Sequence, residues 1–442
     1  SLLLLILIPL FEDLNCINIC SSNIYVYEGS GVMEDKIARW ENPPSLPPTH
    51  YVDNRIFTDS EIFSEERDGI FAAVWKLVCH ESELPQLGSY RALTVAGRPL
   101  IVVRGHDNEI RTFFNICPHR GAPLVRDERG TFGKRIQCFY HLWTYDLVGN
   151  CTGITRPVGY EPVGFSKEGI GLRPVRTEII GGLVFVSIKN EVEPLEDFLG
   201  PMANHIRLHL PDDQPLEVFH YHRSEIRCNW KLWVDNNSEQ YHEFLHVLNR
   251  KTGLAQPDYH ERRWHLYPNS HNVIDQGAMN YGNVGLEERS EGLMPGMQPD
   301  ALLVMLLFPD IMINVRATVM RIDTITPVAP DRTIVEWRGL GLKSDSEEQR
   351  DIRTRHHNQV WGPAGRNLPE DISAVEAQQI SMSNDAFRYS IYAREEELRP
   401  HDDSNLRSFY QEWGRRVGRW PHDAGARRSD KTELGVVGIA SE

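Results

Sequence analysis

The spacing of apolar and polar residues changes along this 442-residue chain. Between residues 59 and 81, apolar side chains recur at helical intervals, which predicts a helix. From residue 89 to 186, short β-branched and apolar runs alternate with Gly, Asn and Asp turns, and this stretch predicts a small antiparallel β domain. Its strands are expected at residues 91–95, 99–103, 110–114 and 182–186.

Beyond residue 188 the pattern is mixed. Residues 216–228 and 302–340 predict further sheet, whereas residues 230–249 and 369–392 predict helices. The segment 280–299 is rich in Gly, Glu and Met and predicts a loop that covers a site. The chain as a whole therefore predicts an α+β fold, in which a small antiparallel β domain precedes a larger domain with an antiparallel sheet flanked by helices.

The length predicts two domains, because a single core seldom grows past about 250 to 300 residues. We place the β domain at residues 76–190, and the larger domain at 191–442 with an N-terminal helical part at 33–75. Residues 1–32 are expected to be a disordered or non-native extension, since Met33 precedes a helix start at residues 35–40.

The apolar run at residues 1–10 is shorter than the roughly 20 residues of a membrane span, and no basic segment precedes it. It predicts no membrane anchor; a truncated signal peptide is the less favoured alternative. The formal net charge of −15 excludes nucleic acid as the expected partner, because phosphates would be repelled. The odd count of seven cysteines predicts a reducing, cytoplasmic location rather than a disulfide framework.

Two short motifs inside the predicted β domain carry metal-ligand residues. Cys117 and His119 form a C-x-H pair, and Cys138 and His141 form a C-x-x-H pair. Two thiolates on one iron and two imidazoles on the other are the ligands of a Rieske [2Fe–2S] cluster. A structural zinc site is the alternative, but zinc fingers usually group cysteine with cysteine and histidine with histidine, so the mixed pairs favour the cluster.

A second ligand pair lies about a hundred residues further on. In a helix spanning Trp230 to Leu248, His242 and His246 would be four residues apart and would share one face. Two histidines with one carboxylate hold Fe(II) in non-haem oxygenases and leave positions open for O₂ and substrate. Two core or surface histidines are the alternative, and the neighbouring cluster motif favours iron. Periodicity cannot choose the third ligand among 62 acidic residues.

From about residue 50 to 420 the chain resembles the alpha subunits of Rieske non-haem iron aromatic-ring-hydroxylating oxygenases. The segments that carry the resemblance are Cys117-Pro118-His119-Arg120-Gly121, Cys138-Phe139-Tyr140-His141-Leu142-Trp143, Asn229-Trp230-Lys231, Glu239-Gln240-Tyr241-His242 and Trp361-Gly362-Pro363-Ala364-Gly365 followed by Pro369-Glu370-Asp371. Leu142 is a departure, because many members have glycine there. The resemblance implies a catalytic domain of the helix-grip, START-like type.

The resemblance also implies residue roles. Asp371 would be the third iron ligand, with Glu370 as runner-up, and Pro369 would open the helix that carries both. Asn236 and Glu239 would support catalysis, and Glu239 would bridge a cluster histidine of one subunit and an iron histidine of its neighbour.

By the same resemblance, the chain would be the terminal oxygenase alpha subunit of a multicomponent ring-hydroxylating dioxygenase. Its partners would be a reductase that uses NAD(P)H, with or without a ferredoxin, and either a small beta subunit in an α3β3 hexamer or further copies in a homotrimer. The expected substrate is an aromatic compound, an aromatic acid by preference. The alternative is a Rieske monooxygenase or oxidative demethylase acting on an aromatic or sulfonated compound.

The substrate pocket is expected between the sheet and the iron helix. Arg316 could neutralise a substrate carboxylate or sulfonate. Candidate pocket residues are Asn236, Leu245, Val304, Met305, Leu307 and Ile313.

Overall fold

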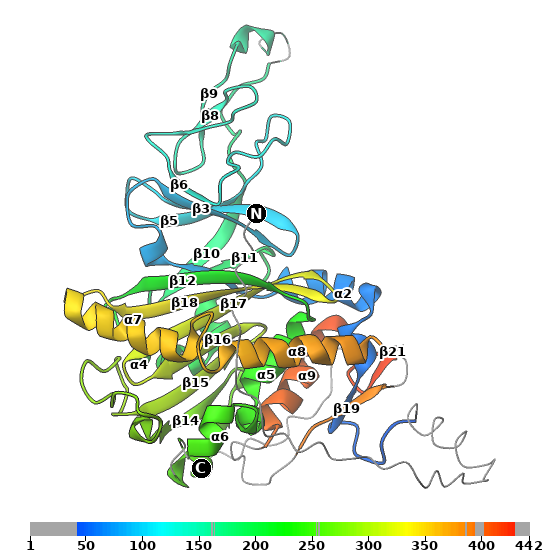
Figure 1. Cartoon of the computed structure of the whole chain (residues 1–442). Coiled ribbons are helices and arrows are strands. Elements are labelled where there is room, and N and C mark those ends of the chain that lie inside the picture. Colours follow the sequence, from blue (N-terminus) through cyan, green and yellow to red (C-terminus); the bar gives the residue numbers. More distant parts are fainter. Residues whose placement is uncertain are drawn as a thin grey trace, which may run out of the picture. The chain divides into compact units, whose positions relative to one another are not determined.

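Figure 1 shows a computed structural model, which describes residues 42–428 except 161, 163, 253, 255–256, 385–386 and 394–401. The predicted extension at 1–32 and the helix start at 35–40 lie outside the described residues. The described residues from 43 onward form one compact unit.

The first sheet is antiparallel and holds seven strands in the order β2-β11-β10-β5-β4-β3-β6. It contains all four strands predicted for this region, which are confirmed by their antiparallel pairing. These strands form because alternating apolar residues bury one face while the intervening turns reverse the chain. A three-stranded sheet, β7-β8-β9, follows the same antiparallel rule. The bounds are β2 (Lys76–His80), β3 (Ser89–Val95), β4 (Arg98–Arg104), β5 (Ile110–Phe114), β6 (Arg129–Thr131), β7 (Ile136–Gln137), β8 (Thr144–Tyr145), β9 (Cys151–Gly153), β10 (Pro174–Ile180) and β11 (Leu183–Ser187).

The second sheet is also antiparallel, with the order β12-β18-β17-β16-β15-β14-β13. It confirms the predicted sheet over 216–228 and 302–340. Its central strands are long apolar runs that are buried on both faces, which is why they sit in the middle of the sheet. The bounds are β12 (Leu216–Ile226), β13 (Trp264–Leu266), β14 (Asn272–Ala278), β15 (Ala301–Leu307), β16 (Ile311–Arg316), β17 (Val319–Ala329) and β18 (Arg332–Leu342).

Helices cover this second sheet. In Figure 1, α7 (Glu347–Trp361) and α8 (Leu368–Met382) follow one another across it, and α7 packs against β12, β17 and β18. A capping box between Ser346 and Gln349 starts α7, and Pro369 stands in the first turn of α8 as predicted. The other helices are α2 (Ser60–Glu66), α3 (Leu195–Leu199), α4 (Met202–His209), α5 (Trp230–Ser238), α6 (Val247–Thr252) and α9 (Ser404–Val417).

Short pieces complete the fold: β1 (Tyr51–Asp53) pairs with β19 (Tyr389–Ile391), and β20 (Arg419–Trp420) pairs with β21 (Asp423–Arg427). No helix in the described part of the chain is long and apolar enough to cross a membrane. The five cysteines that the structure describes are all free.

Three predicted helices are wrong in extent. The helix expected over 59–81 ends as α2 and a π turn at Arg67–Phe71, after which β2 begins. The helix expected over 369–392 ends at Met382. The expected continuous helix from Trp230 to Leu248 breaks after Ser238, because the extended Glu239 turns its side chain onto the following backbone N–H of His242. The loop expected at 280–299 is confirmed, with a short 3₁₀ turn at Tyr281–Val284.

A buried network of ions joins the first sheet to the second. Arg91 of β3 pairs with Glu83 and with Glu336 of β18. Arg338 of β18 reaches back to Glu83, with 2.6 Å between Nε and Oε1. Because these side chains are largely shielded from solvent, loss of one partner would leave a buried charge uncompensated, so the pairs hold β3 and β18 in register with one another. The α+β prediction is confirmed.

Candidate metal centres

Two loops with the same backbone hydrogen bond carry the Cys and His motifs. The first leaves β5 and the second joins β7 to β8. In the first, Gly121 N donates to Cys117 O at 2.9 Å, and in the second, Leu142 N donates to Cys138 O at 3.0 Å. Gly121 and Leu142 both adopt left-handed backbone, with φ of 76° and 59°. Glycine adopts this conformation freely, whereas leucine adopts it only with backbone strain. The loop at Leu142 therefore keeps the same geometry as the loop at Gly121, at a local cost in strain.

The four predicted cluster ligands come together at these loop tips. Cys117 and Cys138 are buried, and the rings of His119 and His141 lie 4.5 Å apart between centroids. Nδ1 of His119 is buried without a partner among the described residues, while its Nε2 lies 3.0 Å from Tyr160 Oη. Two thiols and two imidazoles with an open ring nitrogen fit the ligand set of a [2Fe–2S] cluster.

The phenol of Tyr145 is a contact that sequence reasoning missed. Its Oη lies 3.1 Å from Cys117 Sγ. Burial raises the pKa of the Cys117 thiol, and the hydrogen bond with Tyr145 acts in the opposite direction, because it stabilises the thiolate. Hydrogen bonds to the ligand sulfur tune a cluster's reduction potential, and Tyr145 is placed to make one.

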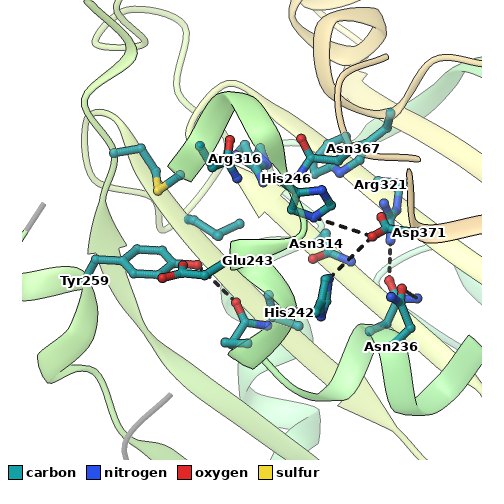
Figure 2. A pocket seen from close by; sticks show the side chains of 17 residues that line it. Asn236, His242, Glu243, His246, Tyr259, Asn314, Arg316, Arg321, Asn367 and Asp371 are labelled. Atoms are coloured by element: carbon teal, nitrogen blue, oxygen red, sulfur yellow. Dashed lines mark hydrogen bonds and ion pairs between the residues drawn. The ribbon is translucent and has the colours of Figure 1, made fainter. Parts of the chain in front are cut away.

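The second centre forms where α5, the 3₁₀ turn η6 (Tyr241–Phe244) and α8 meet. Figure 2 shows His242, His246 and Asp371 converging on one point. Asp371 Oδ1 lies 3.5 Å from Nε2 of each histidine, and all three ligand atoms fall within 4.8 Å of one another. The predicted pair therefore does share one side, although the helix expected to place it there is interrupted.

A glutamate stands behind each imidazole. His242 Nδ1 donates to Glu239 Oε1 at 2.6 Å, and His246 Nδ1 donates to Glu370 Oε2 at 2.8 Å. Glu370 therefore faces the far nitrogen of His246, whereas Asp371 faces the two nitrogens that point to the centre. A carboxylate on the outer nitrogen of a metal-bound histidine fixes its tautomer and ring orientation.

These acids make the centre attractive to a cation. Burial lowers the pKa of His242, but Glu239 and Asp371 outweigh it and raise that pKa to about 10. The pKa of His246 is lowered, chiefly by burial. Asp371 Oδ1 is buried without a hydrogen-bond donor in the part of the chain that the structure describes. Two imidazoles and one carboxylate oxygen on one side fit a non-haem Fe(II) site with open positions.

A pocket of about 570 Å³, part of it open to solvent, adjoins this centre. Among the predicted pocket residues Asn236, Val304 and Arg316 line it. Leu245, Met305, Leu307 and Ile313 do not, and this part of the prediction is wrong. On β15 and β16, Leu302, Val304, Asn314 and Arg316 face the pocket, because side chains two residues apart share a face.

The pocket wall is polar at one end. Arg316 is only 6% exposed, and its Nε and Nη1 have no hydrogen-bond partner among the described residues. Asn314, two residues before it on β16, has an equally unpartnered Nδ2. Burial lowers the pKa of Arg289 to about 10 and that of Arg366 to about 9, and the positive charge of Arg316 contributes to both shifts. Guanidinium groups thus gather at this end of the pocket.

Comparison with known proteins agrees with both centres. Residues 74–162 match the family model for the Rieske [2Fe-2S] domain, and residues 214–419 match the one for the catalytic domain of the ring hydroxylating alpha subunit. The chain is 42% identical to the 2-aminobenzenesulfonate 2,3-dioxygenase subunit alpha of Alcaligenes sp, over 88% of this chain and 98% of that protein.

Two further relatives follow. The chain is 38% identical to the methanesulfonate monooxygenase hydroxylase subunit alpha of Methylosulfonomonas methylovora, over 87% of this chain and 95% of that protein. A crystal structure of naphthalene 1,2-dioxygenase from Rhodococcus sp. bound to indole superposes with a TM-score of 0.74 at 23% identity, covering 83% of this chain and 94% of that one. At that identity the superposition supports the fold alone.

Proposed function

Because this chain belongs to the alpha subunits of Rieske-type ring-hydroxylating oxygenases, enzymes that incorporate O₂ into their substrates, we propose that its own substrate is an organic sulfonate. The aromatic sulfonates are the class that we favour. The observation that carries the proposal is the buried guanidinium of Arg316 in the pocket beside the iron-site residues, because its Nε and Nη1 have no hydrogen-bond partner among the described residues.

The metal roles are part of the proposal. Cys117, His119, Cys138 and His141 would hold the [2Fe–2S] cluster, and His242, His246 and Asp371 would hold Fe(II). When bound, these groups supply electron relay and O₂ activation. The chain itself orients the imidazoles, through Glu239 and Glu370, and shapes a pocket from which water can be displaced.

A sulfonate suits the donors that this pocket offers. Nε and Nη1 of Arg316 and Nδ2 of Asn314 are buried donors that find no acceptor in the part of the chain that the structure describes. A buried charge without a counter-ion is costly, so an anionic ligand that supplies acceptors at this point gains both hydrogen bonds and charge neutralisation. A neutral hydrocarbon would leave all three donors unmet.

The remainder of the pocket favours an aromatic substrate. Its apolar wall is formed by Met279, Leu302, Val304 and Trp361, side chains of the kind that line pockets for small organic ligands. One relative is named for an aromatic sulfonate and another for methanesulfonate. Monooxygenation of a short alkanesulfonate is therefore the second candidate.

As a component of a multicomponent oxygenase, the chain would receive electrons from a reductase, directly or through a ferredoxin. We retain the α3β3 hexamer as the proposed assembly and a homotrimer as its alternative. The bridging role of Glu239 between subunits also stays a prediction; within the chain, both its carboxylate oxygens contact His242.

The test compares a sulfonate with its neutral analogue. Purified oxygenase with a reductase is assayed by O₂ uptake and by ¹⁸O₂ incorporation on benzenesulfonate, 2-aminobenzenesulfonate, methanesulfonate and the neutral benzenesulfonamide. Arg316→Gln removes a charge-assisted hydrogen bond worth about 1.5–3 kcal/mol, so KM for the sulfonate should rise about 10- to 100-fold. Arg316→Lys should recover part of the loss, and the sulfonamide should change little.

The control is Arg355→Gln, which removes an exposed arginine of α7 that pairs with Glu287 outside the pocket lining. It should leave every KM unchanged. Equal losses for sulfonate and sulfonamide in Arg316→Gln, at unchanged iron content, would reject the anion-binding role. Absence of O₂ uptake with every sulfonate in an enzyme loaded with both metals would reject the substrate class.

A further inference from the structure

Three histidines gather at a second place, outside the iron centre and the pocket. His220 and His222 lie on β12, and His357 lies on α7. One ring nitrogen of each lies within 4.8 Å of one nitrogen of the other two, the same limit that holds for His242, His246 and Asp371. The ring centroids of His220 and His357 are 4.5 Å apart, and those of His220 and His222 are 5.3 Å apart.

The backbone around the three histidines leaves space for their imidazole rings. His220 and His222 are two residues apart on an edge strand, so both project toward the helix that covers the sheet. Beside His220 on β18 stands Gly339. A Cβ at this position would lie 3.0 Å from Nδ1 of His357 and 3.1 Å from Cβ of His220. The absence of a side chain at Gly339 therefore lets the imidazole of His357 enter between the strands' side chains.

The imidazoles of this trio lack ordinary partners. His357 is fully buried, and neither of its ring nitrogens has a hydrogen-bond partner in the described part of the chain. Both ring nitrogens of His222 and Nδ1 of His220 are in the same condition. Buried polar atoms are nearly always hydrogen-bonded or bound to a metal, so five unmet nitrogens in one cluster require a common explanation.

Neutral imidazole is the form that binds transition metals, and it carries a lone pair on one ring nitrogen. Each of the three histidines can therefore offer one nitrogen to an ion.

We propose that His220, His222 and His357 form a second metal site, which binds one divalent ion of the zinc class through three imidazoles. All three ligands are nitrogen, which suits Zn²⁺ and excludes Ca²⁺ and Mg²⁺, because those ions require oxygen. Tetrahedral Zn–N bonds of about 2.0–2.1 Å place the nitrogens about 3.4 Å apart, so small side-chain rotations would close the trio around the ion. A fourth position would remain for water.

Two arginines act electrostatically on the trio: Arg321 on His222 and His357, and Arg289 on His357. Arg321 is paired with Asp323, with 2.7 Å between Nε and Oδ1, so its charge is compensated. Arg321 also lines the substrate pocket. A metal bound here would fix α7 to the edge strand beside that pocket.

The competing explanation is aromatic packing. His222 stacks on Trp337 with 4.6 Å between centroids and an interplanar angle of 14°, so the rings could serve as packing without any ion. The two explanations differ in stoichiometry and in ligand shell. Packing predicts no bound ion, whereas the metal site predicts one zinc per chain with three imidazoles.

The test uses the full chain with its iron and cluster in place. Protein is incubated with one to two equivalents of ZnCl₂ and desalted; zinc and iron are then counted, and zinc-edge X-ray absorption reports the number of imidazole ligands. We expect one zinc beyond the iron, a three-imidazole shell and unchanged iron content. His222→Gln and His357→Gln should each weaken zinc retention at least tenfold. His265→Gln, which removes an exposed histidine paired with Asp275, should not.

Gly339→Ala adds an independent check, because it should displace His357 and reduce zinc retention without removing any ligand. His222 is only partly buried, so His222→Gln keeps the test valid if the His357 variant fails to fold. No zinc retained at micromolar concentration would overturn the proposal. Equal retention in the His222 variant would do so too, as would a two-imidazole shell accompanied by loss of iron, because that ion would sit at His242 and His246.

Discussion

Replacing Glu370 by glutamine should weaken the iron centre, whereas replacing Asp371 by asparagine should abolish it. Glu370 Oε2 accepts a hydrogen bond from His246 Nδ1 at 2.8 Å, and glutamine can keep that bond while losing the charge. Loss of such an outer carboxylate typically costs 10- to 100-fold in metal affinity, which is about 1.4–2.7 kcal/mol. Because the Glu370 side chain is 33% exposed, solvent screening places the expected loss near tenfold.

The assay is anaerobic iron titration of the metal-depleted protein, followed by electron paramagnetic resonance of the nitric oxide adduct of the mononuclear iron. The Rieske signal of each reduced sample reports that the cluster is intact. Glu376→Gln is the matched control, because this residue lies on the same helix and its carboxylate accepts from the Arg227 backbone instead. It should bind iron as the wild type does.

The reverse pattern would refute the assignment of these two acids. If Glu370→Gln lost iron completely while Asp371→Asn retained it, Glu370 would be the ligand and the 3.5 Å approaches of Asp371 would be incidental. Equal and partial losses would show that neither acid coordinates the ion alone.

Two further predictions concern the stability of the fold, and a third concerns the loop at Leu142. The pKa of Asp235 is raised from 3.8 to about 7, chiefly by burial, so its contribution to stability is complete below pH 3.8 and is lost as pH rises to about 7. Asp235→Asn should remove about 3 kcal/mol of the difference in unfolding free energy between pH 5 and pH 8, measured by urea titration at both. Glu83→Ala leaves the buried Arg338 and Arg91 short of a partner and should lower the free energy of unfolding by about 3 kcal/mol, visible as a lower Tm, whereas an unchanged Tm would show that Glu336 suffices. Leu142→Gly relieves left-handed strain and should leave the Rieske signal unchanged, whereas Leu142→Val should reduce cluster content.

The sequence predicted that His242 and His246 would lie together, but it placed them on a continuous helix that the structure does not contain. Spacing of four residues predicted one helix face for His242 and His246. The chain instead leaves α5 at Ser238, passes through the extended Glu239 and forms a 3₁₀ turn before α6. The polar residues at the end of α5 compete for backbone hydrogen bonds, which propensity alone does not resolve.

The pocket residues show a limit of a different kind. Residues 301–308 are apolar throughout and buried on both faces of β15, so they contain no alternation from which the phase of the strand could be read. A shift of one residue exchanges the two faces, and without that phase the prediction took residues from both. Val304 lines the pocket, whereas Met305 and Ile313 do not. Arg316 was easier to assign, because a charged residue is rarely buried without a partner or a ligand, and its presence in an apolar strand therefore indicates a site.

The partition between Glu370 and Asp371 follows from helix geometry once the histidines are placed. Adjacent residues of a helix point about 100° apart, so only one of two neighbouring acids can face the point between both imidazoles. With Asp371 at that point, Glu370 and Glu239 reach the outer nitrogens from the sides. Three carboxylates then lie at this centre, and two of them, Glu239 and Asp371, raise the pKa of His242. An anionic substrate approaching this centre would be repelled unless a fixed cation held its charged end away from the acids, and Arg316 lies in the pocket wall where it can do so.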